Sequence, residues 1–179
     1  AHVTLVDRRG LPGGHWNDAY PFVTLHQPSA FYGVNSTPLG SGLKDRSGPN
    51  AGLYELASGP EICAYFQRVL ERRLLASGRV DWRPMCEVQP DGSLVSLLSG
   101  ERTELRVRRK VVDARYLSPA IPSTHRPRFE VAAGVRCVPP NVLPGLWQDA
   151  LPGPRRFAIL GAGKTAMDAA VWLLRAGAD

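Results

Sequence analysis

Residues 155–168 read RRFAILGAGKTAMD, a glycine turn set between an apolar run and a helix-forming segment. Two kinds of phosphate-binding turn match this string. From Ala158, AILGAGKT has the spacing of a degenerate P-loop, whose backbone amides and lysine surround the phosphates of a nucleoside triphosphate. From Gly161, GAGKTA is a G-x-G-x-x-A turn, which places the pyrophosphate of a dinucleotide at the start of a helix. The position of the strand before the glycines distinguishes a P-loop from a dinucleotide turn.

The sequence upstream of the turn favours the dinucleotide interpretation. A P-loop requires a strand that ends near Ala158, but residues 151–156 read LPGPRR and are rich in residues that break strands. The apolar run at 157–160 can form a buried strand, and it leads directly into Gly161. We therefore expect a strand at 157–160 and a helix at 165–176. A P-loop and a plain joint between strand and helix remain the alternatives.

Composition indicates an ordinary globular protein. The chain has 179 residues, of which 44% are apolar, and a formal net charge of +6. No apolar run approaches the roughly 20 residues of a membrane span, and no signal segment is visible, so we expect a cytoplasmic protein without membrane contact. The basic residues are scattered except at 106–110, RVRRK, which we interpret as a solvated sheet edge and not as a nucleic-acid site.

The spacing of cysteine and histidine argues against two further kinds of site. Cys63, Cys86 and Cys137 are odd in number and far apart, so they offer neither a disulfide framework nor a C-x-x-C redox pair. The four histidines show no spacing typical of metal ligands. We therefore predict no metal site.

The N-terminal residues 1–7, AHVTLVD, predict a strand that ends in Asp7. In a dinucleotide fold the second strand ends in such an acid, which hydrogen-bonds the ribose. The alternative is that Asp7 caps the following turn. A loop with paired glycines, RRGLPGGHW, follows at 8–16, and residues 17–56 read as one long irregular segment, which is often functional.

The middle of the chain predicts one helix and several short strands. A capping box at 58–61 opens the helix, which carries an apolar stripe and ends at Gly78. An antiparallel meander follows, and a further apolar strand comes after it. The expected strands lie at 80–88, 94–98, 104–108 and 110–114.

Several motifs follow one another in an order that is more specific than any one of them. They are Gly13-Gly-His-Trp, Tyr20-Pro, Gln27-Pro-Ser with Tyr32, Asn35-Ser-Thr-Pro, Val111-Val-Asp-Ala and Gly161-Ala-Gly-Lys-Thr-Ala-Met-Asp. Together, over nearly the whole chain, they resemble the flavin-containing monooxygenase-like FAD/NAD(P)-binding oxidoreductases, which are flavoproteins with two dinucleotide-binding domains.

The resemblance implies an α/β, Rossmann-like (FAD/NAD(P)-binding) fold with a small antiparallel β-meander. Residues 1–120 would form an FAD-binding domain lacking its first strand and glycine turn, 121–154 a connector, and 155–179 the start of an NAD(P)-binding domain. The chain would then be truncated at both ends. In such an enzyme NAD(P)H reduces the flavin, and the reduced flavin reduces oxygen or another acceptor.

The resemblance also assigns residues to the cofactors. Asp7 would bind the adenosine ribose of FAD. Asn35, the one candidate catalytic residue, matches an Asn that steadies the flavin–oxygen adduct in flavin monooxygenases, although a turn residue is the alternative. The contacts to FAD would be Asp7, Arg8, Gly13, Gly14, His15, Trp16, Gln27, Pro28, Ser29, Asp113 and Ala114. The contacts to NADP(H), with NAD also open, would be Gly161, Gly163, Lys164, Thr165 and Ala166.

The sequence departs from the family pattern in two places. Arg115 and Tyr116 stand where related proteins carry Ala-Thr-Gly, and the connector reads IPSTHRPRF at 121–129 in place of the F-x-G-x-x-x-H fingerprint of monooxygenases. The lack of C-x-x-C argues against disulfide reductases. The sequence thus predicts an FAD-dependent oxidoreductase that uses NAD(P)H to reduce its flavin and acts on a small-molecule substrate, and it supports monooxygenation less strongly than flavin oxidoreduction. A P-loop nucleotide-triphosphate-binding protein and a noncatalytic nucleotide-binding fragment are the alternatives.

Overall fold

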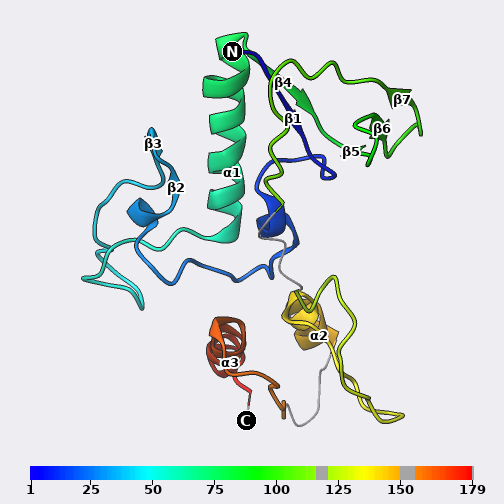
Figure 1. Cartoon of the computed structure of the whole chain (residues 1–179). Helices are drawn as coiled ribbons and strands as arrows, with labels where there is room; N and C mark the ends of the chain where they lie inside the picture. Colours follow the sequence, from blue (N-terminus) through cyan, green and yellow to red (C-terminus); the bar gives the residue numbers. More distant parts are fainter. Residues whose placement is uncertain (116–120, 150–155, 179) are drawn as a thin grey trace. The chain divides into compact units, whose positions relative to one another are not determined.

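The computed structural model describes residues 1–115, 121–149 and 156–178 (Figure 1). Across these residues the protein is mixed α/β, with small sheets and three α-helices. It divides into two compact units, which are described separately. Unit 1 comprises Ala1–Asn17 and Pro60–Ser118, and unit 2 comprises Asp18–Gly59 and Pro119–Asp179. The domain boundaries predicted at 120 and 154 fall on residues outside the described part of the chain and stay predictions.

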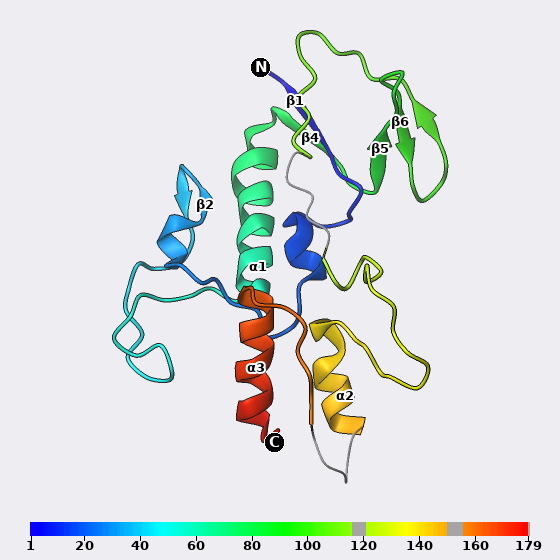
Figure 2. The same ribbon diagram turned by 60° about the horizontal axis from the view of Figure 1, so that its bottom comes forward.

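Unit 1 contains a pair of parallel strands. β1 (Val3–Val6) pairs with β4 (Val80–Arg83), with Val3 opposite Val80. Parallel neighbours need a long crossover, and α1 (Gly59–Val69) lies between them in sequence and alongside them in Figures 1 and 2. The strand predicted at 1–7 is confirmed. A strand, a helix and a parallel strand in this order are the repeating element of α/β proteins. The mixed α/β structure agrees with the coarse fold class, and the Rossmann-like fold stays a prediction.

The helix predicted up to Gly78 is also confirmed, although its last turns are not α-helical. After α1 the chain continues as one π-helical turn, η3 (Leu70–Leu74), and one 3-10 turn, η4 (Leu75–Ser77). Gly78 ends it with a φ of 65° in the left-handed region, which glycine adopts without a steric penalty. The apolar stripe forms the core of unit 1, where Ile62 is 0% and Tyr65 2% exposed.

The predicted antiparallel meander exists, but its strands are shorter than expected. It consists of β5 (Cys86–Val88), β6 (Leu94–Ser96) and β7 (Arg102–Thr103). The single strand predicted at 80–88 is wrong, because the chain turns at Pro84 and Met85. Proline cannot donate to a ladder, and Met85 has a positive φ of 51°, so β4 joins the parallel pair while β5 joins the meander.

The strands predicted at 104–108 and 110–114 are wrong. The meander ends at Thr103, and residues 104–115 form no regular structure. Val111 and Val112 are 72% and 79% exposed. A strand needs a neighbour to hydrogen-bond with, and in the described part of the chain nothing pairs with this segment. The residues 106–110 are therefore an exposed basic segment and not the edge of a sheet.

Unit 2 begins with the long irregular segment that the sequence predicts. It contains the 3-10 turn η2 (Ser29–Phe31) and a β-hairpin whose strands, β2 (Gly33–Val34) and β3 (Thr37–Pro38), have two residues each. Isolated bridges pair Thr24 with Ser58 and Lys44 with Tyr54, so the segment folds back on itself. Its buried side chains include Tyr20, Val23, Leu25, Leu39 and Ala57.

Two helices complete unit 2. α2 (Leu143–Asp149) follows the 3-10 turn η5 (Pro140–Val142), and α3 (Lys164–Ala176) follows the glycine turn. They lie beside each other in Figures 1 and 2, and Leu143 packs with Ala169 and Leu173 in one core cluster. Phe22 stacks on Trp172 with ring centroids 5.2 Å apart, which joins the irregular segment to α3. The helix predicted at 165–176 is confirmed and begins one residue earlier.

The strand predicted at 157–160 is wrong. Residues 156–162 lead into α3 without regular structure, and Leu160 is 72% exposed. Phe157 packs against the core cluster of unit 2, and the centroid of its ring lies 6.2 Å from that of Trp147. The apolar run has the composition of a buried strand, but no described strand lies beside it to form a sheet. Among the described residues, no helix has the length and apolar character needed to cross a membrane.

Candidate functional site

Gly161 lies close to Ala166 in the glycine turn of unit 2. Gly161 has a φ of +139°, and a Cβ placed on it would lie 3.4 Å from the Cβ of Ala166. Gly163 precedes α3, and its carbonyl accepts hydrogen bonds from the N–H groups of Ala166 and Met167 at 3.0 and 3.1 Å. The first and third small residues of the motif thus lie close together, but residues 157–160 do not form the strand on which the helix was predicted to pack.

The second glycine faces open space. Gly163 has an extended backbone with φ −85° and ψ 179°, and a Cβ placed on it would meet no atom within 4 Å. Glycine is therefore not needed there for folding. At the start of α3 the first backbone N–H groups lack helical partners and carry partial positive charge. A phosphate group can reach this backbone most closely where no side chain projects.

A network of four polar side chains lies beside the turn. Lys164 forms an ion pair with Asp168 one helical turn later, and Asp168 Oδ2 also accepts a hydrogen bond from the Tyr20 hydroxyl at 2.7 Å. Lys164 Nζ lies 3.5 Å from the Tyr20 oxygen. Thr165 hydrogen-bonds to the same phenol. Tyr20 therefore links the irregular segment to the first turn of α3.

The position of Lys164 bears on the P-loop alternative. A P-loop lysine reaches over the bound phosphates. Here the ammonium group is paired with Asp168, toward the C-terminal end of α3, and α3 begins at Lys164 itself. A helix that starts directly after Gly163 fits both a dinucleotide turn and a P-loop, so the start of α3 does not separate the two interpretations.

The protonation of Tyr20 gives a testable pH dependence. Tyr20 is 8% exposed, and burial together with the hydrogen bond to Asp168 raises its pKa well above the ordinary value of 10.0. The folded protein keeps this proton where the unfolded chain loses it. Stability should be unaffected below about pH 10 and should then fall with rising pH by up to about 1.4 kcal/mol per unit. Urea unfolding between pH 8 and 11 measures this, and Tyr20→Phe should flatten the fall. Parallel curves for both proteins would contradict it.

Asp7 stands at the end of β1, where the sequence places a ribose-binding acid. Its Oδ1 accepts a hydrogen bond from the N–H of Arg9 at 2.8 Å, so it caps the turn after the strand. Its own N–H donates to the carbonyl of Arg83 at 3.1 Å. Asp7 thus caps the turn, which was the alternative to ribose binding. Its half-buried carboxylate also lies at the end of β1, where a ribose-binding acid is expected. Arg8 is exposed, 3.7 Å from Glu87.

The first of the paired glycines, Gly13, packs against α1. Gly13 has a φ of +116°, and a Cβ on it would lie 3.2 Å from Asn17 Nδ2 and 3.4 Å from Cys63 Sγ. Burial raises the pKa of that thiol. The close approach of loop and helix accounts for Gly13, while Gly14, with φ +56°, opens the 3-10 turn η1 (Gly14–Asp18). The rings of His15 and Trp16 lie 5.2 Å apart on η1.

Ser29, predicted with Gln27 and Pro28 to line a flavin pocket, is 1% exposed, whereas Gln27 and Pro28 are half-buried. Its hydroxyl donates to the carbonyl of Glu55 at 2.9 Å and accepts from the N–H of Ala57 at 2.8 Å. Both hydrogen-bonding functions of this side chain are engaged in joining 27–29 to 55–57. Its role in the structure is to hold the irregular segment together.

Substituting Ser29 tests this role. Ser29→Ala leaves the buried N–H of Ala57 without an acceptor, so we expect a loss of stability of about 1–3 kcal/mol. Ser47→Ala, at an exposed serine of the same segment, should change stability by no more than about 0.5 kcal/mol. Urea unfolding of both variants gives the comparison, and equal stabilities would refute the role.

Asn35 and the pair Asp113 and Ala114 are exposed. Asn35 is a turn residue of the hairpin between β2 and β3, which was the alternative interpretation. Asp113 accepts two side-chain hydrogen bonds and one backbone hydrogen bond from Arg115, each at 2.9 Å, and these bonds hold the pKa of its carboxyl well below the usual range. Tyr116 lies outside the described residues.

The structure therefore brings together one group of predicted residues, Gly161 to Ala166. The residues predicted to contact FAD are divided between the two units. Sequence reasoning missed Tyr20 and Asp168 as members of a site. The four-residue spacing of Lys164 and Asp168 on a helix is a signal for their pairing, but nothing local indicates Tyr20.

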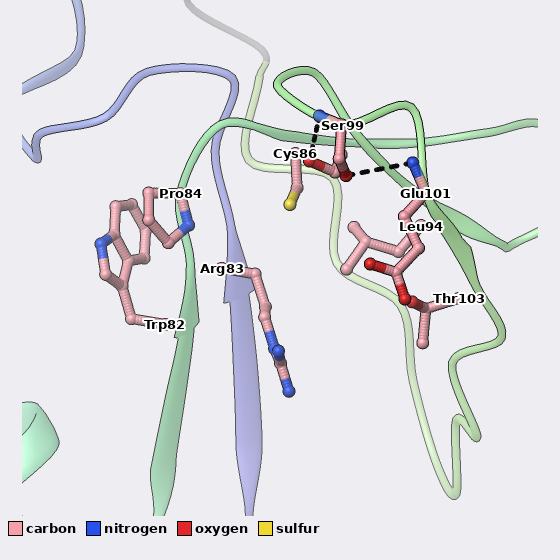
Figure 3. A pocket seen from close by; sticks show the side chains of 9 residues that line it. Trp82, Arg83, Pro84, Cys86, Leu94, Ser99, Glu101 and Thr103 are labelled. Carbon is pink, nitrogen blue, oxygen red and sulfur yellow. Dashed lines mark hydrogen bonds between the residues drawn. The ribbon is translucent and has the colours of Figure 1, made fainter.

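Unit 1 also has a shallow open pocket of about 290 Å³ between the end of β4 and the meander (Figure 3). Several of its polar groups are engaged within the protein. Arg83 Nε donates to Asp81 at 2.8 Å, and Ser99 Oγ accepts from the N–H of Glu101 at 3.2 Å. No residue predicted from the sequence lines it. The lining residues are Trp82, Arg83, Pro84, Cys86, Leu94, Ser96, Ser99, Glu101 and Thr103.

Comparison with known proteins gives relatives without an assigned activity. The chain is 51% identical over 176 residues to uncharacterized proteins of Mycobacterium bovis and Mycobacterium tuberculosis. The aligned region covers 98% of this chain and 32% of each relative, so the chain spans about a third of their length. No protein family profile matches the chain, and no solved structure matches it.

Proposed function

We propose that this chain is part of an NAD(P)H-dependent flavoprotein oxidoreductase whose second dinucleotide-binding domain begins at the Gly161 turn. The observation that carries the proposal is the close approach of Gly161, in the turn before α3, to Ala166 in the first turn of α3. In a G-x-G-x-x-A turn the third small residue lets the helix pack closely on the preceding strand. Here residues 157–160 form no strand, and Ala166 approaches Gly161 itself. The parallel pair of β1 and β4, with α1 between them in sequence, is consistent with a first α/β domain of the same kind.

The residues of the turn fit the pyrophosphate of NAD(P)H. The free space at Gly163 would admit the phosphates to the backbone, and the first turn of α3 would supply N–H donors and a favourable dipole. Lys164 and Thr165 follow Gly163 directly in the sequence. Ala166 would keep the helix close to the turn. These residues bind and orient the dinucleotide, and none of them acts as an acid, base or nucleophile.

For FAD the fit rests on fewer observations. Asp7 ends β1 with a half-buried carboxylate, which suits the ribose hydroxyls of an adenosine. Gly13, Gly14, His15 and Trp16 follow in the same unit. Bound FAD would supply the redox chemistry by accepting a hydride from the nicotinamide. The same proposal includes a small-molecule substrate. It also includes monooxygenation as the reaction, with Asn35 as the residue that would steady the flavin–oxygen adduct.

The visible absorption spectrum of the purified full-length protein tests the proposal. The expected result is the pair of oxidised flavin bands, which bleach when NADPH is added without oxygen. A folded, colourless protein that takes up no added FAD would overturn it. In that case magnesium-dependent binding of ATP or GTP, lost in Lys164→Ala, would identify the P-loop alternative, and binding of neither ligand would identify a noncatalytic fragment.

A further inference from the structure

We propose that Asp168 is a positioning residue that holds Lys164 back from the glycine turn, so that a dinucleotide must draw the lysine away to use its charge. This inference rests on the proposed function of the turn. The two side chains are paired across one helical turn and are 30% and 25% exposed. Partial burial weakens the screening of such a pair by water and salt.

The direction of Lys164 supports the inference. On a helix the Cα–Cβ bonds tilt toward the N-terminus, so a lysine at the first position can extend toward a ligand bound there. The Lys164 ammonium group is instead paired with the Asp168 carboxylate and lies 3.5 Å from the Tyr20 oxygen. Its positive charge is therefore neutralised within the protein.

The hydrogen bond from Tyr20 keeps Asp168 partnered when its ion pair with Lys164 breaks. The Tyr20 hydroxyl donates to Asp168 Oδ2 at 2.7 Å and stays protonated through the neutral range. When Lys164 leaves, the carboxylate keeps this donor and is not left unpaired. Thr165, a second residue of the turn, also hydrogen-bonds to Tyr20. The network thus restrains the two polar side chains of the predicted pyrophosphate site.

The test is the dissociation constant of NADPH for the full-length protein and its Asp168→Asn variant. The amide oxygen of Asn can still accept from Tyr20, but the charge that holds Lys164 is gone. We expect Asp168→Asn to bind NADPH about two- to fivefold more tightly, as expected for release of a partly exposed ion pair. Inorganic pyrophosphate should show the same gain, and adenosine, which lacks phosphate, should show none.

Two further variants separate positioning from a general structural effect. In a Lys164→Met background, Asp168→Asn should give no gain, because no ammonium group remains to be released. Thermal unfolding of each variant shows whether the fold is kept. Weaker or unchanged NADPH binding by a folded Asp168→Asn protein would overturn the inference while leaving the proposed function intact. If the native protein binds no NADPH at all, the proposed function fails first and the inference fails with it.

Discussion

Gly163→Val is expected to weaken binding of NADP(H) by at least about 100-fold, equivalent to about 2.7 kcal/mol, with little change in stability. The backbone of Gly163 is in the extended region, which valine adopts readily, and its Cβ direction is empty. The substitution fills the space through which a pyrophosphate would approach. Titration of NADPH by fluorescence measures the loss, and urea unfolding measures the stability.

Gly161→Ala is the informative counterpart of this variant. The positive φ and the 3.4 Å contact with Ala166 mean that a side chain strains this position, so a cost of about 1–3 kcal/mol in stability is expected. The two glycines should therefore separate folding from binding. If Gly163→Val binds NADPH as well as the native protein does, the turn is only a joint between segments.

Ile62→Ala should produce the largest loss of stability, about 2–5 kcal/mol. Ile62 is 0% exposed at the centre of the α1 stripe, so truncation removes buried contacts and leaves a cavity. The loss should lower the midpoint of urea unfolding. Because α1 lies beside the parallel pair in unit 1, uptake of FAD by the full-length protein should decline in parallel.

Leu98→Ala is the matched control, since Leu98 is 78% exposed in the same unit. Its truncation should change stability by no more than about 0.5 kcal/mol. Similar midpoints for the two variants would mean that the α1 stripe does not form the core of unit 1.

α1 and α3 were predictable because their signals are local, whereas α2 lies in the segment that was predicted to be a connector. Apolar spacing and Gly78 define α1 and its continuation, and helix-forming residues after Gly163 define α3. The strands were harder, because a strand depends on a neighbour that can lie far away in the sequence. Residues 110–114 and 157–160 have the composition of buried strands, yet in the described part of the chain they have no neighbour.

The candidate site shows the same division. The approach of Gly161 to Ala166 could be predicted, because the motif itself requires it. The restraint of Lys164 by Asp168 follows from a local spacing, whereas the part played by Tyr20 depends on tertiary packing. Likewise, the role of Ser29 in joining two segments is visible only once Ala57 is beside it.

The pairing of β1 with β4 also has a consequence for the order in which the chain folds. Val3 must meet Val80, so a long loop has to close before this ladder gains any hydrogen bond. β5 and β6 are joined by a short turn, and α1 and α3 need only local contacts. We therefore expect the helices and the meander to form early and the parallel pair to form late. The N-terminal strand would be the last part of unit 1 to become protected from hydrogen exchange during refolding.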